Sequence, residues 1–181
     1  MNWQEQLQEY QRTKEWDKAI DFMNQTIATN QDDKWAYIQA IYLFHNILLE
    51  EDYPDEKQES LASLLQGYFE DSNHKFSTDP DYLFFIGKIL HIAEWYFGLE
   101  DISLAISFQK KALDMKPYKL LYEWAYRLSC NGDQVADYLA YQLVANEKSI
   151  IEWLNSKGFP GDYILEHLMM SNERYVNRKA T

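Results

Sequence analysis

The sequence has little of what disulfide-rich or all-β domains need. Among its 181 residues there is one cysteine, Cys130, so no disulfide can form within the chain. Six glycines and four prolines are few for the many tight turns of a sandwich or barrel, whereas long helices joined by short turns need little of either. The composition therefore favours an all-α fold.

The chain also lacks an apolar leader and a long uncharged run. Its first residues carry neither the basic segment nor the apolar segment of a signal peptide, so we expect a cytoplasmic protein. The most apolar stretch, residues 82–99, contains Lys88, His91 and Glu94, and a bilayer would penalise those side chains. We expect a buried helix there and no membrane partner.

Basic residues are outnumbered, since 17 Lys and Arg face 29 Asp and Glu, which gives a net charge of −12. Residues 50–81 hold ten acidic and two basic side chains, a balance of −8. Such a field repels nucleic acid and attracts basic proteins. The carboxylates either serve only to solvate an exposed loop and helix, or they form a binding surface. The second interpretation defines an acidic flank that consists of Glu50, Glu51, Asp52, Asp55, Glu56, Glu59, Glu70 and Asp71.

Motifs for catalysis or cofactor binding are missing. The sequence has no glycine-rich phosphate loop, no Cys-x-x-Cys and no His-Glu-x-x-His. His91 and Glu94 are spaced as half of a helical di-iron motif, which also needs a second such pair and two further glutamates. We expect no cofactor, no metal and no catalytic residue. The alternative of a different class is a helical metal-dependent enzyme centred on His91 and Glu94.

Apolar residues recur with a helical period along almost the whole chain, and this pattern predicts about ten helices in a single domain, residues 1–181. The expected helices cover residues 3–12, 16–30, 35–49, 54–71, 80–97, 101–115, 118–130, 133–145, 148–157 and 162–175. Asp79 and Pro80 predict a helix cap followed by proline in the first turn. Residues 72–78 are expected to form a polar connector, residues 131–133 and 158–161 turns, and residues 176–181 a frayed tail.

Two segments of the chain look alike. Ala19-Ile20-Asp21-Phe22 recurs as Ala105-Ile106-Ser107-Phe108, each nine residues after a tyrosine, and Ala112 and Pro117 follow the second copy. This pattern resembles the tetratricopeptide repeat, most clearly over residues 86–117, less over 2–32 and poorly over 34–75. The resemblance implies a right-handed solenoid of antiparallel helical hairpins. Another helical bundle or solenoid is the alternative.

The resemblance also implies that the first helix of each hairpin lines a concave groove that binds a polypeptide. Carried onto this chain, the groove offsets include Gln8, Gln11, Trp35, Tyr42, His45, Glu94, Tyr122 and Tyr126. Core residues could occupy several of the same offsets, such as Ile38, Leu90 and Phe97. The expected groove lacks the lysines and arginines with which relatives hold the terminal carboxylate of a peptide, which argues against a co-chaperone of that type.

These features together favour a non-enzymatic module that binds another protein. Its most concrete form is an immunity protein that neutralises a basic toxin, such as a nuclease, by occluding the active site. A general scaffold or regulatory adaptor is the alternative within the same class. A DNA-binding regulator is disfavoured because we find no basic recognition helix.

Overall fold

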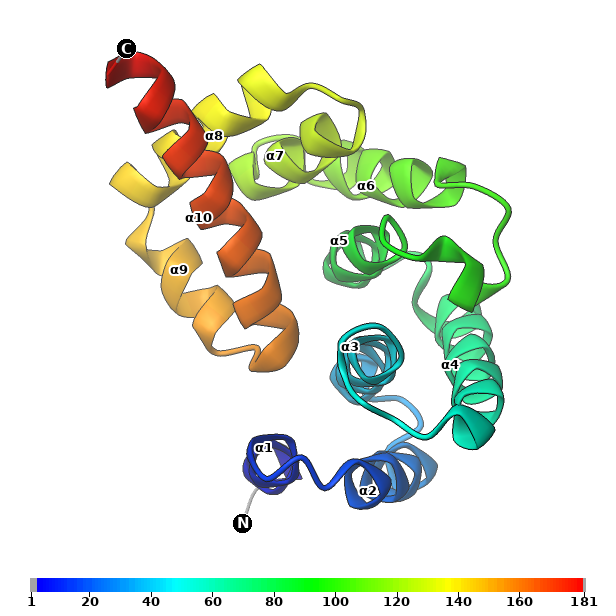
Figure 1. The fold of residues 1–181 in the computed structure, drawn as a ribbon. Helices are drawn as coiled ribbons and strands as arrows, with labels where there is room; N and C mark the ends of the chain where they lie inside the picture. Colours follow the sequence, from blue (N-terminus) through cyan, green and yellow to red (C-terminus); the bar gives the residue numbers. More distant parts are fainter. Residues whose placement is uncertain (1–2, 181) are drawn as a thin grey trace. The chain divides into compact units, whose positions relative to one another are not determined.

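The computed structural model describes residues 3–180, and in this range the chain forms ten α-helices, one short 3-10 helix and no strand (Figure 1). The elements are α1 (Trp3–Arg12), α2 (Trp16–Thr29), α3 (Lys34–Glu50), α4 (Asp55–Phe76), α5 (Pro80–Ile89), η1 (Glu94–Phe97), α6 (Ser103–Met115), α7 (Leu120–Ser129), α8 (Asp133–Asn146), α9 (Lys148–Asn155) and α10 (Phe159–Ala180). The expected all-α class and the number of helices are confirmed.

The helices divide into two compact units. The first unit contains α1 to α4, together with the short segment Trp95–Leu99 that returns to it. The second unit contains α5 to α10. No helix in the described part of the chain combines the length and the apolar character that crossing a bilayer requires.

The core of the first unit is α3, in which every residue from Ala36 to His45 is buried. A helix that is apolar on all sides is stable only when it is surrounded. α4 packs against α3 in the opposite direction, because Tyr37 lies near Phe76 (ring centroids 5.8 Å apart) while Phe44, further along α3, lies over the earlier Tyr68 (5.9 Å). The returning segment adds Phe97 to this core.

α2 and α4 run in the same direction on the first unit. Lys57 Nζ on α4 lies 2.7 Å from a carboxylate oxygen of Asp17 on α2. The two contacts that follow join residues that lie further along the chain on both sides. The Tyr68 hydroxyl donates to Asn24 Oδ1 (2.8 Å), and Lys75 Nζ donates to the Gln31 carbonyl (3.3 Å). α3 thus comes between two parallel helices, α2 and α4, in the sequence. The polar contacts cross a groove that separates α2 from α4.

The core of the second unit is α5, in which every residue from Tyr82 to Ile89 is buried. α6 packs closely on it, with Ala105 and Ala112 fully buried as the need for small side chains at a helix contact predicts. At Gly87 a Cβ atom would lie 2.6 Å from the side-chain nitrogen of Gln109, so a larger residue would displace that side chain from its hydrogen bond to the Phe84 carbonyl. α10 packs back on α8 and α9.

The expected ends of two helices, α4 and α5, are wrong. The helix that begins at Pro80 ends at Ile89 and not at Phe97, and Ala93 then adopts a left-handed backbone conformation (φ 51°) before η1. His91 and Glu94 therefore do not share a helical turn, and the geometric basis for a di-iron half-site is lost. α4 extends to Phe76, through most of the expected polar connector.

The C-terminal boundary also differs from expectation. α10 begins at Phe159, where a turn was expected, and continues to Ala180, where residues 176–181 were expected to fray; Thr181 lies outside the described residues. The last turns are held by Asp137 of α8, which is fully buried and accepts from Arg174 (2.8 Å) and Arg178 (2.5 Å). A tertiary anchor of this kind leaves no trace in the periodicity of a single helix.

Candidate functional site

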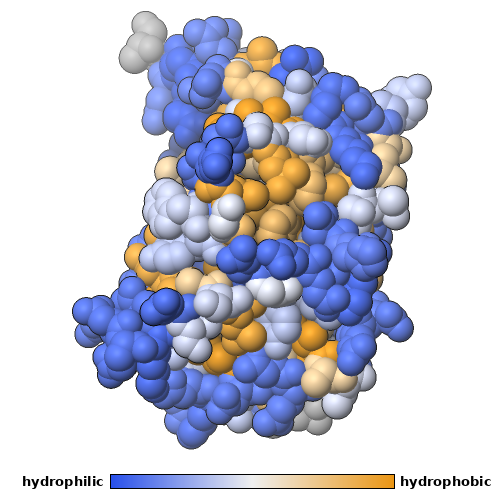
Figure 2. Space-filling view, turned by 90° about the vertical axis from the view of Figure 1, so that its right-hand side faces the viewer, coloured by the Kyte–Doolittle hydropathy of each residue, from blue (hydrophilic) through white to orange (hydrophobic). Residues whose placement is uncertain are grey.

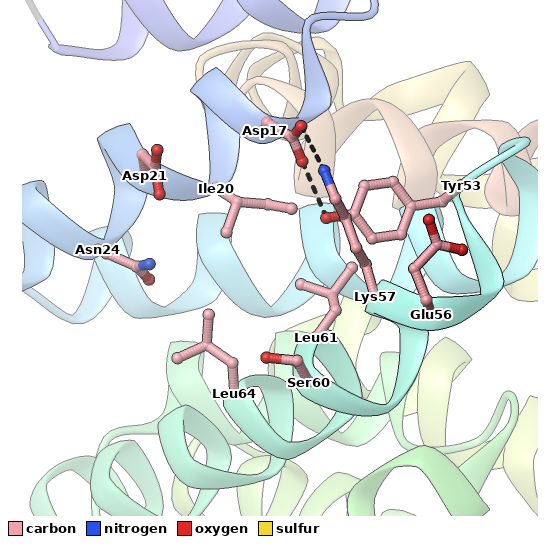
Figure 3. A pocket seen from close by; sticks show the side chains of 10 residues that line it. All are labelled: Asp17, Ile20, Asp21, Asn24, Tyr53, Glu56, Lys57, Ser60, Leu61 and Leu64. Carbon is pink, nitrogen blue, oxygen red and sulfur yellow. Dashed lines mark hydrogen bonds and ion pairs between the residues drawn. The ribbon is translucent and has the colours of Figure 1, made fainter.

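The groove between α2 and α4 contains an open cavity of about 460 Å³ (Figure 3). Its lining consists of Asp17, Ile20, Asp21 and Asn24 from α2, Tyr53 from the preceding loop, and Glu56, Lys57, Ser60, Leu61 and Leu64 from α4. A second, smaller cavity of about 290 Å³ continues along the same groove and shares Asn24. Both cavities lie within the first unit.

At one end of the larger cavity three polar side chains meet, and Figure 3 shows Asp17 joined to the amine of Lys57 and to the hydroxyl of Tyr53. Asp17 accepts from Lys57 Nζ (2.7 Å) and from the Tyr53 hydroxyl (3.1 Å). The hydrogen bond from Lys57 holds the pKa of Asp17 below its ordinary value. Burial and the neighbouring Asp17 raise the pKa of Tyr53 to about 12, so at neutral pH the hydroxyl remains a donor to a charged carboxylate.

The rest of the cavity has an apolar floor and two carboxylates that form no ion pair with the described residues. Ile20 and Leu61 are buried beneath it. Asp21 on α2 and Glu56 on α4 are exposed, and neither forms an ion pair with any residue that the structure describes. The cavity therefore has carboxylates on both helices and an apolar floor.

The smaller cavity contains a satisfied polar network. Lys75 Nζ lies 2.8 Å from both the Tyr37 hydroxyl and a carboxylate oxygen of Asp71, and the Tyr37 hydroxyl also donates to Asp71. The hydrogen bonds from Lys75 and Tyr37 lower the pKa of Asp71. The polar groups at this end of the groove already bind one another, so the larger cavity is the better candidate for binding a partner.

The acidic flank is exposed almost throughout. Seven of its eight residues are exposed, while Glu51 is half-buried and pairs with Lys14 (2.8 Å). Glu50, Asp52, Glu56 and Glu59 form no ion pair within the described chain. On the face drawn in Figure 2, hydrophilic residues form most of the surface and apolar residues appear as patches between them. Glu56 lines the groove, and Glu50, Asp52 and Glu59 are exposed between the end of α3 and the first turns of α4.

The expected aromatic groove is not open at three of its residues. Tyr42, His45 and Tyr122 have exposed fractions of 1%, 3% and 0%, so they lie in the interior and cannot contact a partner. His45 stacks on Phe97 (5.7 Å), and Tyr122 stacks on Phe84 (5.0 Å) and donates its hydroxyl to Asp81. A helical period groups residues on a face of a helix, but it does not reveal whether that face is covered.

The other groove candidates remain at or near the surface of their own units. Gln8 is exposed, and the remaining candidates, Gln11, Trp35, Glu94 and Tyr126, are half-buried. Among the described residues, no three His, Cys, Asp or Glu side chains are arranged to hold a metal ion.

The residues of α2 that line the cavity were missed at the sequence level. Asp17, Asp21 and Asn24 recur at intervals of four and three, which places them on one helical face. Glu56 and Ser60 repeat the same spacing on α4. A polar stripe opposite the apolar one was the available pattern, but an exposed stripe of that kind is usual for any surface helix.

Comparison of the chain with protein-family models, with curated proteins and with solved structures finds no match.

Proposed function

We propose that the chain is a non-enzymatic protein-binding module that binds a basic protein through the acidic face of its first unit. The observation that carries the proposal is the group of exposed carboxylates without ion pairs, Glu50, Asp52, Glu56 and Glu59, of which Glu56 lines the open groove. The most concrete form is an immunity protein that covers the cationic active site of a toxin such as a nuclease.

Electrostatic attraction supports this proposal. Two carboxylates of the acidic flank are paired, Glu51 with Lys14 and Asp71 with Lys75. The other four carboxylates, Glu50, Asp52, Glu56 and Glu59, have no ion pair within the described chain, so a cationic partner could pair with them. Such charges speed the encounter of two proteins more than they add to affinity, which suits an inhibitor that must capture its target quickly.

We also propose that the hairpins form a tetratricopeptide-like solenoid. The parallel directions of α2 and α4, with α3 running oppositely, support this arrangement. The buried alanines Ala105 and Ala112 at the contact of α5 with α6 also support it. In a solenoid of this kind the groove between α2 and α4 separates the second helices of two successive hairpins.

A comparison of two charge-reversed baits tests the proposed function. In the first variant, Glu50, Asp52, Glu56 and Glu59 are all changed to lysine. In the matched control, the exposed residues Glu100, Glu152, Glu166 and Glu173 are changed to lysine, which alters the net charge equally but lies in the second unit. Each bait is incubated with lysate of the source cell, and the captured proteins are identified and quantified by mass spectrometry.

We expect the unmodified chain and the control to capture the same basic protein in stoichiometric amounts, and the first variant to lose it. Capture that the first variant retains, or a captured protein without a basic surface, contradicts the proposal. For the immunity form, co-expression of the captured protein with the unmodified chain should restore growth, whereas co-expression with the first variant should not. Capture of several unrelated basic proteins would instead favour a general scaffold.

A further inference from the structure

The shape and charge of the larger cavity indicate which basic side chain of a partner it would bind. We infer that this cavity receives one arginine side chain of the basic partner, whose guanidinium binds between the acidic walls of α2 and α4. The inference rests on the proposed function and names the chemical group that the groove recognises.

A cation already occupies one end of the cavity. Lys57 reaches across from α4 to Asp17 of α2 (2.7 Å), and both side chains remain about half exposed, at 45% and 62%. The groove therefore holds positive charge between its two helices without burying it deeply. Asp21 and Glu56 keep two further negative charges that Lys57 does not neutralise.

The acceptors of the cavity are distributed over both walls. Asp21 and Asn24 line it from α2, and Ser60 lines it from α4, as the labelled side chains of Figure 3 show. An ammonium group acts as a single point charge, whereas the planar guanidinium presents five N–H donors and can bind a carboxylate bidentately. Acceptors on facing walls are therefore better satisfied by arginine than by a second lysine.

The floor of the cavity suits the stem of the same side chain. Ile20, Leu61 and Leu64 form an apolar base beneath the polar walls. Long cationic side chains place their methylene groups on apolar surface and keep the charged end near water. The volume of about 460 Å³ also falls within the range of about 300–1,000 Å³ that is usual for ligand pockets.

The first test fills the cavity without changing any charge. Ser60→Phe places a ring into the cavity, and Ser63→Phe is the matched control, because Ser63 is also exposed on α4 but does not line the cavity. The probes are the capped peptides Gly-Arg-Gly, Gly-Lys-Gly and Gly-citrulline-Gly, of which the last has the shape of arginine without its charge. Binding is measured by NMR titration of the backbone amides of the whole chain.

We expect the arginine peptide to shift the amides near Asp21, Asn24 and Ser60 and to bind about fivefold more tightly than the lysine peptide. The citrulline peptide should cause no shift. Ser60→Phe should weaken arginine binding about fivefold or more, while Ser63→Phe should leave it unchanged. Equal affinities for the arginine and lysine peptides, or unchanged binding to Ser60→Phe, would overturn the inference.

The second test removes the charge of one wall. Asp21→Asn should weaken binding of the arginine peptide several-fold, whereas Asp32→Asn, an exposed carboxylate outside the cavity, should not. Equal losses in the two variants would show only a general effect of charge and would also overturn the inference.

The two proposals can fail separately. If the four-residue charge reversal abolishes capture of the partner but Ser60→Phe does not weaken it, the proposed function stands and the arginine site is refuted. If the peptide titrations give the expected pattern but the charge-reversed chain still captures the partner, the cavity binds arginine, but the partner is not recognised through the acidic face and the proposed function is refuted.

Discussion

Lys88 is the residue whose surroundings conflict most with its charge. It is 5% exposed in the last turn of α5, and it forms no ion pair with any described residue. Its Nζ lies 5.0 Å from the centre of the Trp124 ring, a contact that replaces little of the lost water. Burial lowers the pKa of Lys88 to about 8. At neutral pH the folded chain therefore keeps a charged amine in its interior.

We predict that Lys88→Met stabilises the chain at pH 7. The lowered pKa corresponds to a cost of about 3 kcal/mol for the charged amine, and loss of the contact with Trp124 offsets about 1–2 kcal/mol of the gain. We therefore expect the free energy of unfolding to rise by about 1–2 kcal/mol, which urea denaturation would measure. A variant that is less stable at pH 7 would show that the amine has a stabilising partner.

The same residue gives a pH dependence with a defined sign. Between the folded pKa of about 8 and the ordinary value of 10.5, the unfolded chain binds more protons at Lys88 than the folded chain does. Stability contributed by this residue should therefore increase as pH rises through that window. The difference in unfolding free energy between Lys88→Met and the unmodified chain should shrink from pH 7 to pH 10, and a constant difference would contradict this origin.

At the scale of an element, the last turns of α10 are attached to α8 through one carboxylate. Asp137 on α8 is fully buried and binds Arg174 and Arg178, both of which are nearly half exposed. The arginines can rehydrate if the pair is broken, whereas the aspartate cannot. The contact therefore joins the last turns of α10 to the body of the second unit.

We predict that Asp137→Asn weakens this anchor, because a neutral amide loses the charge-assisted hydrogen bonds. The expected loss of stability is about 1–3 kcal/mol, with faster hydrogen exchange at the backbone amides of residues 174–179. Asp133→Asn, an exposed change on the same helix, serves as the control. Unchanged exchange rates in Asp137→Asn would mean that packing alone holds the end of α10.

The elements themselves were largely predictable. Asp79 caps α5 by accepting from the backbone amides of Asp81 and Tyr82, and Pro80 occupies the first turn, as the pair of residues predicted. The turn after α7 was predicted from Asn131-Gly132, and Asn131 does adopt a left-handed conformation (φ 56°). The end of α5 was not predictable, because the apolar run continues past Ile89 and nothing local in it breaks a helix.

The candidate site was predictable only in its charge. The exposed acidic flank follows from composition and spacing, but the cavity requires α2 and α4 to lie side by side, and residues 17 and 57 are brought together only by the fold. The prediction that Tyr42, His45 and Tyr122 line an open groove was wrong, because all three are buried. An aromatic side chain suits a core and an interface equally well, so its type does not decide between them.

At the scale of the whole molecule, charge is divided unequally between the two units. The first holds 15 acidic and 6 basic residues, a balance of −9, and the second holds 14 and 11, a balance of −3. A field concentrated on one unit guides a cationic partner to that unit over distances comparable to the Debye length, which is about 10 Å at 0.1 M salt. Recognition by this chain should therefore be sensitive to salt in its rate of association.

The most direct test of binding through the acidic face is the association rate constant of the captured partner, measured at low and at physiological salt. For the unmodified chain and the second-unit control we expect fast association at low salt that slows about tenfold or more as salt is raised. For the variant with lysine at positions 50, 52, 56 and 59 we expect slow association at low salt, with its circular dichroism and melting temperature unchanged. An association rate at low salt equal to that of the unmodified chain would contradict the proposal that these carboxylates recognise the partner.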